Sequence, residues 1–119
     1  MKKKLLTLAL GLSVMLGVYA AETPGFPGGD AALNKYLQAN MKYPAEALEN
    51  GVEGVVTVAF IVKADGSLTS LKVLKMVDPD LEKEALRLVA TMPRWIPAEK
   101  DGTPIEAPSN VEINFEIPD

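Results

Sequence analysis

The chain contains neither cysteine nor histidine among its 119 residues. Without cysteine it has no disulfide scaffold, no thiolate metal site, no cysteine nucleophile and no processing site of a bacterial lipoprotein. Without histidine it lacks the commonest general base and the commonest metal ligand. We therefore expect no catalysis and no bound metal or cofactor.

The other residues with reactive side chains have structural explanations. Asp78 and Asp80 stand where a helix is expected to begin, and acids are favoured at that position. Glu84 is expected on the surface of the same helix. Thr69 and Lys72 have a nucleophile-x-x-Lys spacing, but on a strand they point to opposite faces and cannot cooperate. An enzyme such as a hydrolase is the least favoured class.

The N-terminus has the layout of a secretory signal peptide. Lysines at 2–4 precede an apolar stretch from Leu5 to Val18, and small residues follow at Ala20 and Ala21. We predict cleavage after Ala20. An uncleaved anchor is the alternative, but the apolar stretch is shorter than the roughly 20 residues that cross a bilayer.

Cleavage changes the charge of the chain. It removes three lysines and no acid, which leaves 9 basic and 16 acidic residues and a net charge of −7. Nucleic-acid phosphates are bound by clustered Lys and Arg, so an acidic chain is a poor candidate for that role. The mature chain has no second hydrophobic segment. We expect a periplasmic protein without direct membrane insertion.

The first part of the mature chain is expected to be an irregular leader followed by helices. Pro and Gly residues break any pattern over 21–29, and residues 30–119 form the expected domain. A helix is predicted from Asp30, because apolar residues recur at helical spacing: Leu33, Tyr36, Leu37 and Met41. A short second helix starts with Pro44 at its first position and ends at Gly51, a left-handed cap.

Two strands are expected next. Gly54–Val62 is apolar on both faces, which is typical of a central strand. Asp65 and Gly66 form a turn dipeptide, so a hairpin leads into a return strand over Leu68–Lys75.

The last part of the chain is predicted to be a helix, a broken connection and a strand. The helix begins with Asp78 as its N-cap and ends at Met92. Residues 94–108 read as a connection with a turn at Asp101–Gly102. The strand from Val111 to Ile117 alternates cleanly: Val111, Ile113, Phe115 and Ile117 face inward, and Glu112, Asn114 and Glu116 face outward.

This order of elements predicts an α+β domain. Helices pack on one face of a three-stranded antiparallel sheet. A right-handed crossover places the last strand beside the first, so the sheet order is 2-1-3 with the last strand at an open edge.

The only tryptophan, Trp95, lies between Pro93 and Pro97 just after the expected helix. We interpret it as a core residue that fixes how the chain leaves the helix, rather than as an exposed binding aromatic. Tyr43 is interpreted in the same way, as packing at the end of a helix.

Several residues in order resemble the TonB C-terminal domain family. The Tyr-Pro dipeptide, two spaced glycines and an alternating strand carry the likeness: Tyr43-Pro44, Ala47, Gly51, Gly54, Val56, Val58, Phe60, Val62, Gly66, Val73, Leu81, Ala85, Val89, Trp95 and Pro97-Ala98. Three further segments resemble its Bacteroidetes-type branch: Phe26-Pro27-Gly28-Gly29-Asp30, Met92-Pro93-Arg94-Trp95 and Ile113-Asn114-Phe115. The likeness spans about residues 26–117.

The resemblance implies a fold and a partner. Members of the family deliver energy from an inner-membrane motor to outer-membrane receptors, and their last strand adds a receptor segment, the TonB box, to its edge. The implied partner is an outer-membrane TonB-dependent receptor or another TonB-like domain. The implied binding residues are Val111, Glu112, Ile113, Asn114, Phe115, Glu116 and Ile117, with Tyr43 and Pro44 nearby.

The chain also departs from a full energy transducer. Its leader is too short to span a periplasm, so we expect that it does not couple to the motor by itself. Glu112 and Glu116 put negative charge on the expected binding strand. Two interpretations remain open: a stand-alone periplasmic binding module, or an accessory or decoy domain that binds receptors or transducer domains without transmitting force.

Overall fold

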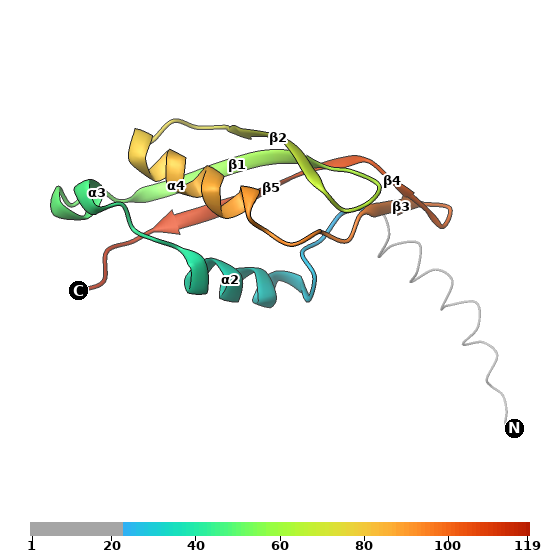
Figure 1. Cartoon of the computed structure of the whole chain (residues 1–119), viewed down its shortest axis with the longest axis horizontal. Coiled ribbons are helices and arrows are strands. Elements are labelled where there is room, and N and C mark those ends of the chain that lie inside the picture. The colour runs from blue at the N-terminus through green and yellow to red at the C-terminus, as the bar shows by residue number, and fades with distance from the viewer. Residues whose placement is uncertain (1–22) are drawn as a thin grey trace, which may run out of the picture.

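A computed structural model describes residues 23–119, and the expected signal peptide, 1–20, lies outside the described residues. A three-stranded sheet forms the centre of this part of the chain, with helices beside it and a small hairpin at one end (Figure 1). In chain order the elements are α2 (Gly29–Asn40), α3 (Ala45–Glu49), β1 (Gly54–Val62), β2 (Leu68–Val73), α4 (Pro79–Ala90), β3 (Ala98–Lys100), β4 (Thr103–Ile105) and β5 (Ala107–Phe115).

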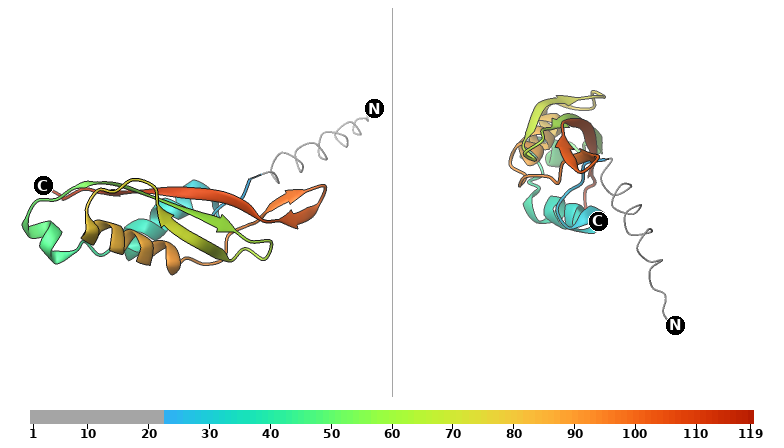
Figure 2. Two further views of the ribbon diagram at one scale, coloured as in Figure 1. Left: turned by 90° about the horizontal axis from the view of Figure 1, so that it is seen from above. Right: turned by 90° about the vertical axis from the view of Figure 1, so that its right-hand side faces the viewer.

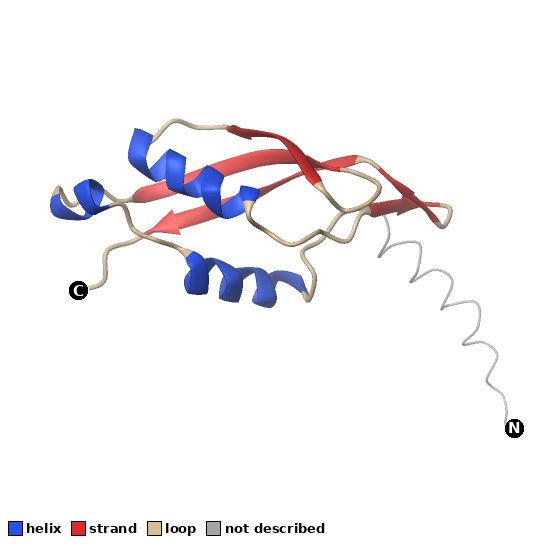
Figure 3. Ribbon diagram, in the orientation of Figure 1, coloured by secondary structure: helices blue, strands red, loops and turns tan. Residues whose placement is uncertain are grey.

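The sheet has the predicted order, with β1 in the middle. β2 and β5 both pair with β1 in the antiparallel sense, which gives the order β2-β1-β5 (Figure 3). The β1–β5 ladder is continuous from Gly54↔Phe115 to Val62↔Ala107. The two apolar faces of β1 therefore predicted its central place correctly.

The two faces of the sheet differ in burial. α4 packs against β1 and β2, and α2 lies along the β5 side (Figures 1 and 2). No helix within residues 23–119 covers the opposite face (Figure 2). Val55, which alternates with the buried residues of β1, is 44% exposed. The largest fully buried side chains come from β1, β5 and α4: Phe60, Phe115, Leu81, Leu88, Ile113, Val56, Val58, Val62 and Val89.

The start of α4 follows the predicted capping pattern. The Asp78 carboxylate accepts the backbone N–H groups of Asp80 and Leu81, at 3.0 and 3.1 Å. Pro79 fits the first turn, where its missing N–H has no partner to lose. This cap fixes where α4 begins and thus which of its side chains face β1.

Trp95 is a core residue, as its place after α4 predicted. It is 6% exposed, and its ring centroid lies 5.0 Å from that of Phe60 and 5.9 Å from that of Phe26. Its backbone N–H donates to the carbonyl of Gly66 at 2.8 Å. Gly66 has φ +89°, and a Cβ there would lie 2.3 Å from the Trp95 carbonyl oxygen, so the turn requires glycine.

The segment before α2 packs on the domain. Phe26 is buried in the core beside Trp95, and Gly25 forms an isolated antiparallel bridge with Ile96. Two backbone hydrogen bonds, of 3.0 and 2.8 Å, join Gly25 and Ile96. This contact ties the residues before α2 to the end of the sheet that carries the hairpin.

Several boundaries differ from the sequence-based expectation. The last strand begins at Ala107 rather than Val111 and ends at Phe115 rather than Ile117. The return strand β2 ends at Val73, not Lys75. Pro44 is the N-cap of α3 and not its first residue. Helices and strands end where hydrogen bonding ends, which side-chain patterns locate only within a few residues.

The connection over residues 94–108 contains a hairpin that the sequence analysis missed. β3 and β4 pair with each other around a turn at Asp101–Gly102, where both residues have positive φ. The turn was predicted, but its flanking strands were not. Each strand has only three residues, and β4 contains Pro104, so no alternation of apolar residues predicts these strands.

The outer strand β2 carries an irregularity. Its register against β1 shifts between Ala59 and Ile61, and Ser70 has a left-handed φ of 57°. A bulge of this kind kinks a strand and increases its twist. The β2 edge is therefore kinked, whereas the β5 ladder runs without interruption.

Candidate functional site

The direction of the backbone groups in β5 follows from the pairing of β1. The Leu74 N–H donates to the Thr57 carbonyl at 2.9 Å, and the Lys63 N–H donates to the Ser67 carbonyl at 2.8 Å. Odd-numbered residues of β1 therefore turn their N–H and C=O groups toward β2. Because these groups alternate along a strand, the even-numbered residues turn theirs toward β5.

The register between β1 and β5 determines which residues of β5 turn their backbone groups toward β1. Val111 and Ile113 stand opposite even-numbered residues of β1, so their N–H and C=O groups point into the sheet. The N–H groups of Asn110, Glu112 and Asn114 consequently point away from the sheet. No other strand within residues 23–119 pairs with this side of β5, so the strand presents a row of donors and acceptors along its free edge.

Two further observations in and after β5 agree with these directions of the N–H groups. Pro108, which has no N–H, occupies an outward position opposite Ile61, where no ladder hydrogen bond is lost. The N–H of Ile117 points inward beyond the strand end and donates to the Glu53 carboxylate at 2.7 Å. Ile117 is therefore held by a side chain and not by the ladder.

A groove of about 610 Å³ runs along this free edge, between β5 and α2. We call it the edge groove. Residues at helical spacing on α2 form one wall, and the end of β5 with the residues after it forms the other. It is lined by Asn34, Leu37, Gln38, Met41, Tyr43, Glu112, Ile113, Asn114, Glu116 and Pro118.

Tyr43 links the segment after α2 to the end of β5. Its ring meets Phe115 edge to face, with centroids 5.8 Å apart, and its hydroxyl donates to the Val52 carbonyl. Burial, together with the carboxylates of Glu53 and Asp78, raises the pKa of Tyr43, so the hydroxyl stays protonated and keeps this hydrogen bond. Tyr43 thus packs as expected for a residue at a helix end, and it also lines the edge groove.

Pro44 lies on the other side of this segment. It lines a separate hollow of about 430 Å³ with Lys42, Lys83 and Arg87. Of the two residues of the Tyr-Pro dipeptide, only Tyr43 lines the edge groove together with residues of the last strand.

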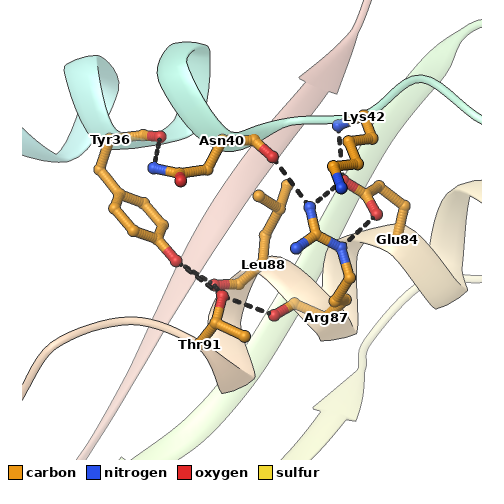
Figure 4. Close-up of polar contacts among 7 residues, drawn as sticks. All are labelled: Tyr36, Asn40, Lys42, Glu84, Arg87, Leu88 and Thr91. Carbon is orange, nitrogen blue, oxygen red and sulfur yellow. Dashed lines mark hydrogen bonds and ion pairs between the residues drawn. The ribbon is translucent and has the colours of Figure 1, made fainter.

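A polar cluster fixes the end of α2 against α4 (Figure 4). The Glu84 carboxylate accepts the Lys42 N–H at 2.7 Å and two N–H groups of Arg87, each at 2.7 Å. Arg87 also donates to the Asn40 carbonyl at 2.8 Å. A second anchor is the Tyr36 hydroxyl, which donates to the Leu88 carbonyl at 2.9 Å.

The expectation that Glu84 lies on the helix surface was wrong. The residue is 8% exposed, and burial opposes its ionisation, but the hydrogen bonds from Arg87 and the Lys42 N–H outweigh burial and lower the pKa of Glu84. The sequence does not reveal that Glu84 holds the end of α2, because the N–H group that it accepts comes from a distant segment. By holding Lys42, Glu84 sets the position of neighbouring Tyr43 and hence of the groove wall.

Within residues 23–119, no cluster of three or more acidic, histidine or cysteine side chains could hold a metal ion. No helix over that range is both long and apolar enough to cross a membrane.

Comparisons with known proteins point to one family. The model of the family described as Gram-negative bacterial TonB protein C-terminal matches residues 39–117. Two curated relatives, both named Protein TonB and from Helicobacter pylori strains 26695 and J99, are 32% identical over 73 residues, which are 60% of this chain and 26% of theirs. The chain thus spans about a quarter of the length of these curated relatives.

Two solved structures share the fold. Both are NMR solution structures of the Helicobacter pylori TonB C-terminal domain, and both are 24% identical to this chain. One has a TM-score of 0.55 and covers 72% of this chain and 78% of its own; the other has a TM-score of 0.56 and covers 75% and 94%.

Proposed function

This chain belongs to the family of Gram-negative bacterial TonB C-terminal domains, and from that premise we propose that it binds an outer-membrane TonB-dependent receptor in energy-dependent transport. A receptor segment adds as a fourth strand at the free edge of β5. The role is one of binding, without catalysis. It uses Glu112, Ile113 and Asn114 at the centre of the edge.

The observation that carries this proposal is the free, uninterrupted edge of β5 with the edge groove beside it. The N–H groups of Asn110, Glu112 and Asn114 point away from the sheet and match the alternate groups of an added strand. In strand addition the backbone supplies affinity, and pockets for alternate side chains supply specificity. The edge groove offers such a place for side chains on the α2 side.

Amide exchange tests this proposal residue by residue. A synthetic peptide from the N-terminal periplasmic segment of a receptor of the same bacterium is titrated into the labelled mature domain. The amides of Asn110, Glu112 and Asn114 should gain protection from exchange, while those of Val111 and Ile113, already paired in the sheet, should change little. Protection that appears only elsewhere would refute binding at this edge.

We further propose that the domain works in the periplasm after removal of its signal peptide. The lysines at 2–4, the apolar stretch and Ala20 support export, since this is the layout that signal peptidase cleaves. The intact mass of protein recovered from the periplasm should correspond to a chain that starts at Ala21. A membrane-bound form that retains the lysines would refute the proposal.

A further inference from the structure

The free edge of β5 is acidic. Glu112 and Glu116 are exposed and line the edge groove, and none of the groove-lining residues from 23–119 is Lys or Arg. A smaller hollow at the end of the strand is lined by Glu53, Glu116 and Asp119. Any segment that lies along this edge therefore lies beside carboxylates.

A strand added to β5 would meet two different surfaces. Side chains that stand opposite Glu112 and Asn114 share their face of the sheet, which none of the described helices covers. The intervening side chains point to the other face, toward Leu37, Met41 and Tyr43 in the edge groove. One face of the added strand is thus in contact with apolar groups and the other with acidic or amide groups.

We propose that the segment which adds to β5 is an extended stretch of the partner protein in which apolar residues alternate with Lys or Arg. This inference rests on the proposed function and specifies its ligand. Cross-strand neighbours lie about 4.5–5.5 Å apart, where opposite charges attract and like charges repel. Glu112 and Glu116 therefore favour a basic segment and disfavour an acidic one.

Three peptides of equal length test the proposal. All carry Val at alternate positions, and the positions between are Lys in one peptide, Gln in the second and Glu in the third. Each carries a fluorescent label and is titrated with the mature domain at low ionic strength. The Lys peptide should bind about 3- to 10-fold more tightly than the Gln peptide, and the Glu peptide should bind most weakly. Added salt should reduce the difference, because these charges are exposed.

Matched variants locate the effect. The double variant Glu112→Gln, Glu116→Gln should remove the preference for Lys over Gln. The double variant Glu46→Gln, Glu49→Gln on α3 changes the net charge equally, at exposed residues outside the edge groove, and should keep the preference. A preference that persists in the first variant, or disappears in the second, overturns the proposal.

The remaining outcomes separate this inference from the proposed function. If all three peptides bind equally and protect the amides of Asn110, Glu112 and Asn114, strand addition stands and the charge preference is overturned. If none binds while a receptor peptide does, the alternating pattern is overturned. If neither binds, both proposals fall. If sedimentation shows a dimer that Glu112→Gln, Glu116→Gln dissociates, the edge is occupied by a second copy, which also overturns the inference.

Discussion

Proline substitutions at Ile113 and Asn114 separate the two sides of β5, because only the first removes an N–H group that the fold uses. In Ile113→Pro the ladder hydrogen bond to Val56 is lost, and leaving its buried partner unpaired costs about 1–3 kcal/mol. Ile113 is 0% exposed, and the smaller proline ring removes packing worth about 0.5–1.5 kcal/mol. The free energy of unfolding should therefore fall by about 2–4 kcal/mol. Ile113→Val measures the packing part alone.

Asn114→Pro should leave the fold intact and weaken binding. Its N–H points away from the sheet, as at Pro108 in the same strand, so the change in stability should stay within about 1 kcal/mol. An added strand would lose one donor, which corresponds to about 0.5–1.5 kcal/mol, or roughly 2- to 12-fold in the dissociation constant. Asn114→Ala keeps the N–H and should bind the peptide like the wild type.

Urea unfolding followed by circular dichroism gives the stabilities, and titration of a labelled receptor peptide gives the affinities. If Asn114→Pro destabilises the domain as much as Ile113→Pro does, the Asn114 N–H is paired in the fold and its outward direction is wrong. If Asn114→Pro and Asn114→Ala bind the peptide equally well, β5 is not the binding edge.

Three further predictions concern the residues that hold the domain together. Trp95→Ala should lower the free energy of unfolding by about 3–5 kcal/mol, and Trp95→Phe by less, because the buried indole N–H has no hydrogen-bond partner within residues 23–119; equal losses in urea unfolding would contradict this. Gly66→Ala should destabilise more than Gly51→Ala: both place alanine at positive φ, which costs about 1–2 kcal/mol, but only at Gly66 would the Cβ collide with a backbone oxygen. Equal melting temperatures of the two variants would contradict that. Because the fold lowers the pKa of Glu84, its stabilising contribution is complete above the ordinary glutamate pKa of about 4.3 and is lost as the pH falls through the folded value. Wild type should therefore lose stability more steeply than Glu84→Gln below that pH in acid unfolding curves, and parallel curves would argue against the assigned role.

The sheet order could be predicted because its determinants lie in local patterns. Apolar residues on both faces of Gly54–Val62 predicted a central strand, and the Asp65–Gly66 turn predicted a hairpin with the next one. Once β2 is placed, the handedness of the crossover leaves one side of β1 for the last strand. The cap at Asp78 was equally local, since donors and acceptor lie within a few residues.

The parts that could not be predicted depend on contacts between distant segments. The outward direction of the Asn114 N–H depends on the register between β1 and β5, which no side-chain pattern encodes. Glu84 is buried because the Lys42 N–H reaches it from the end of α2, and it resembles any helix-surface acid in the sequence. The edge groove exists only because α2 lies along β5. The sequence could therefore predict the strand as a binding element, but it could not predict that α2 forms the other wall of the groove.

The kink in β2 has a consequence for stoichiometry. A bulged strand that carries an exposed lysine, here Lys72, resists pairing with another strand, since its backbone groups are no longer in a regular row. β5 offers the only uninterrupted edge of the three-stranded sheet within residues 23–119. The sheet can therefore grow in one direction only, and strand addition should saturate at one peptide per domain.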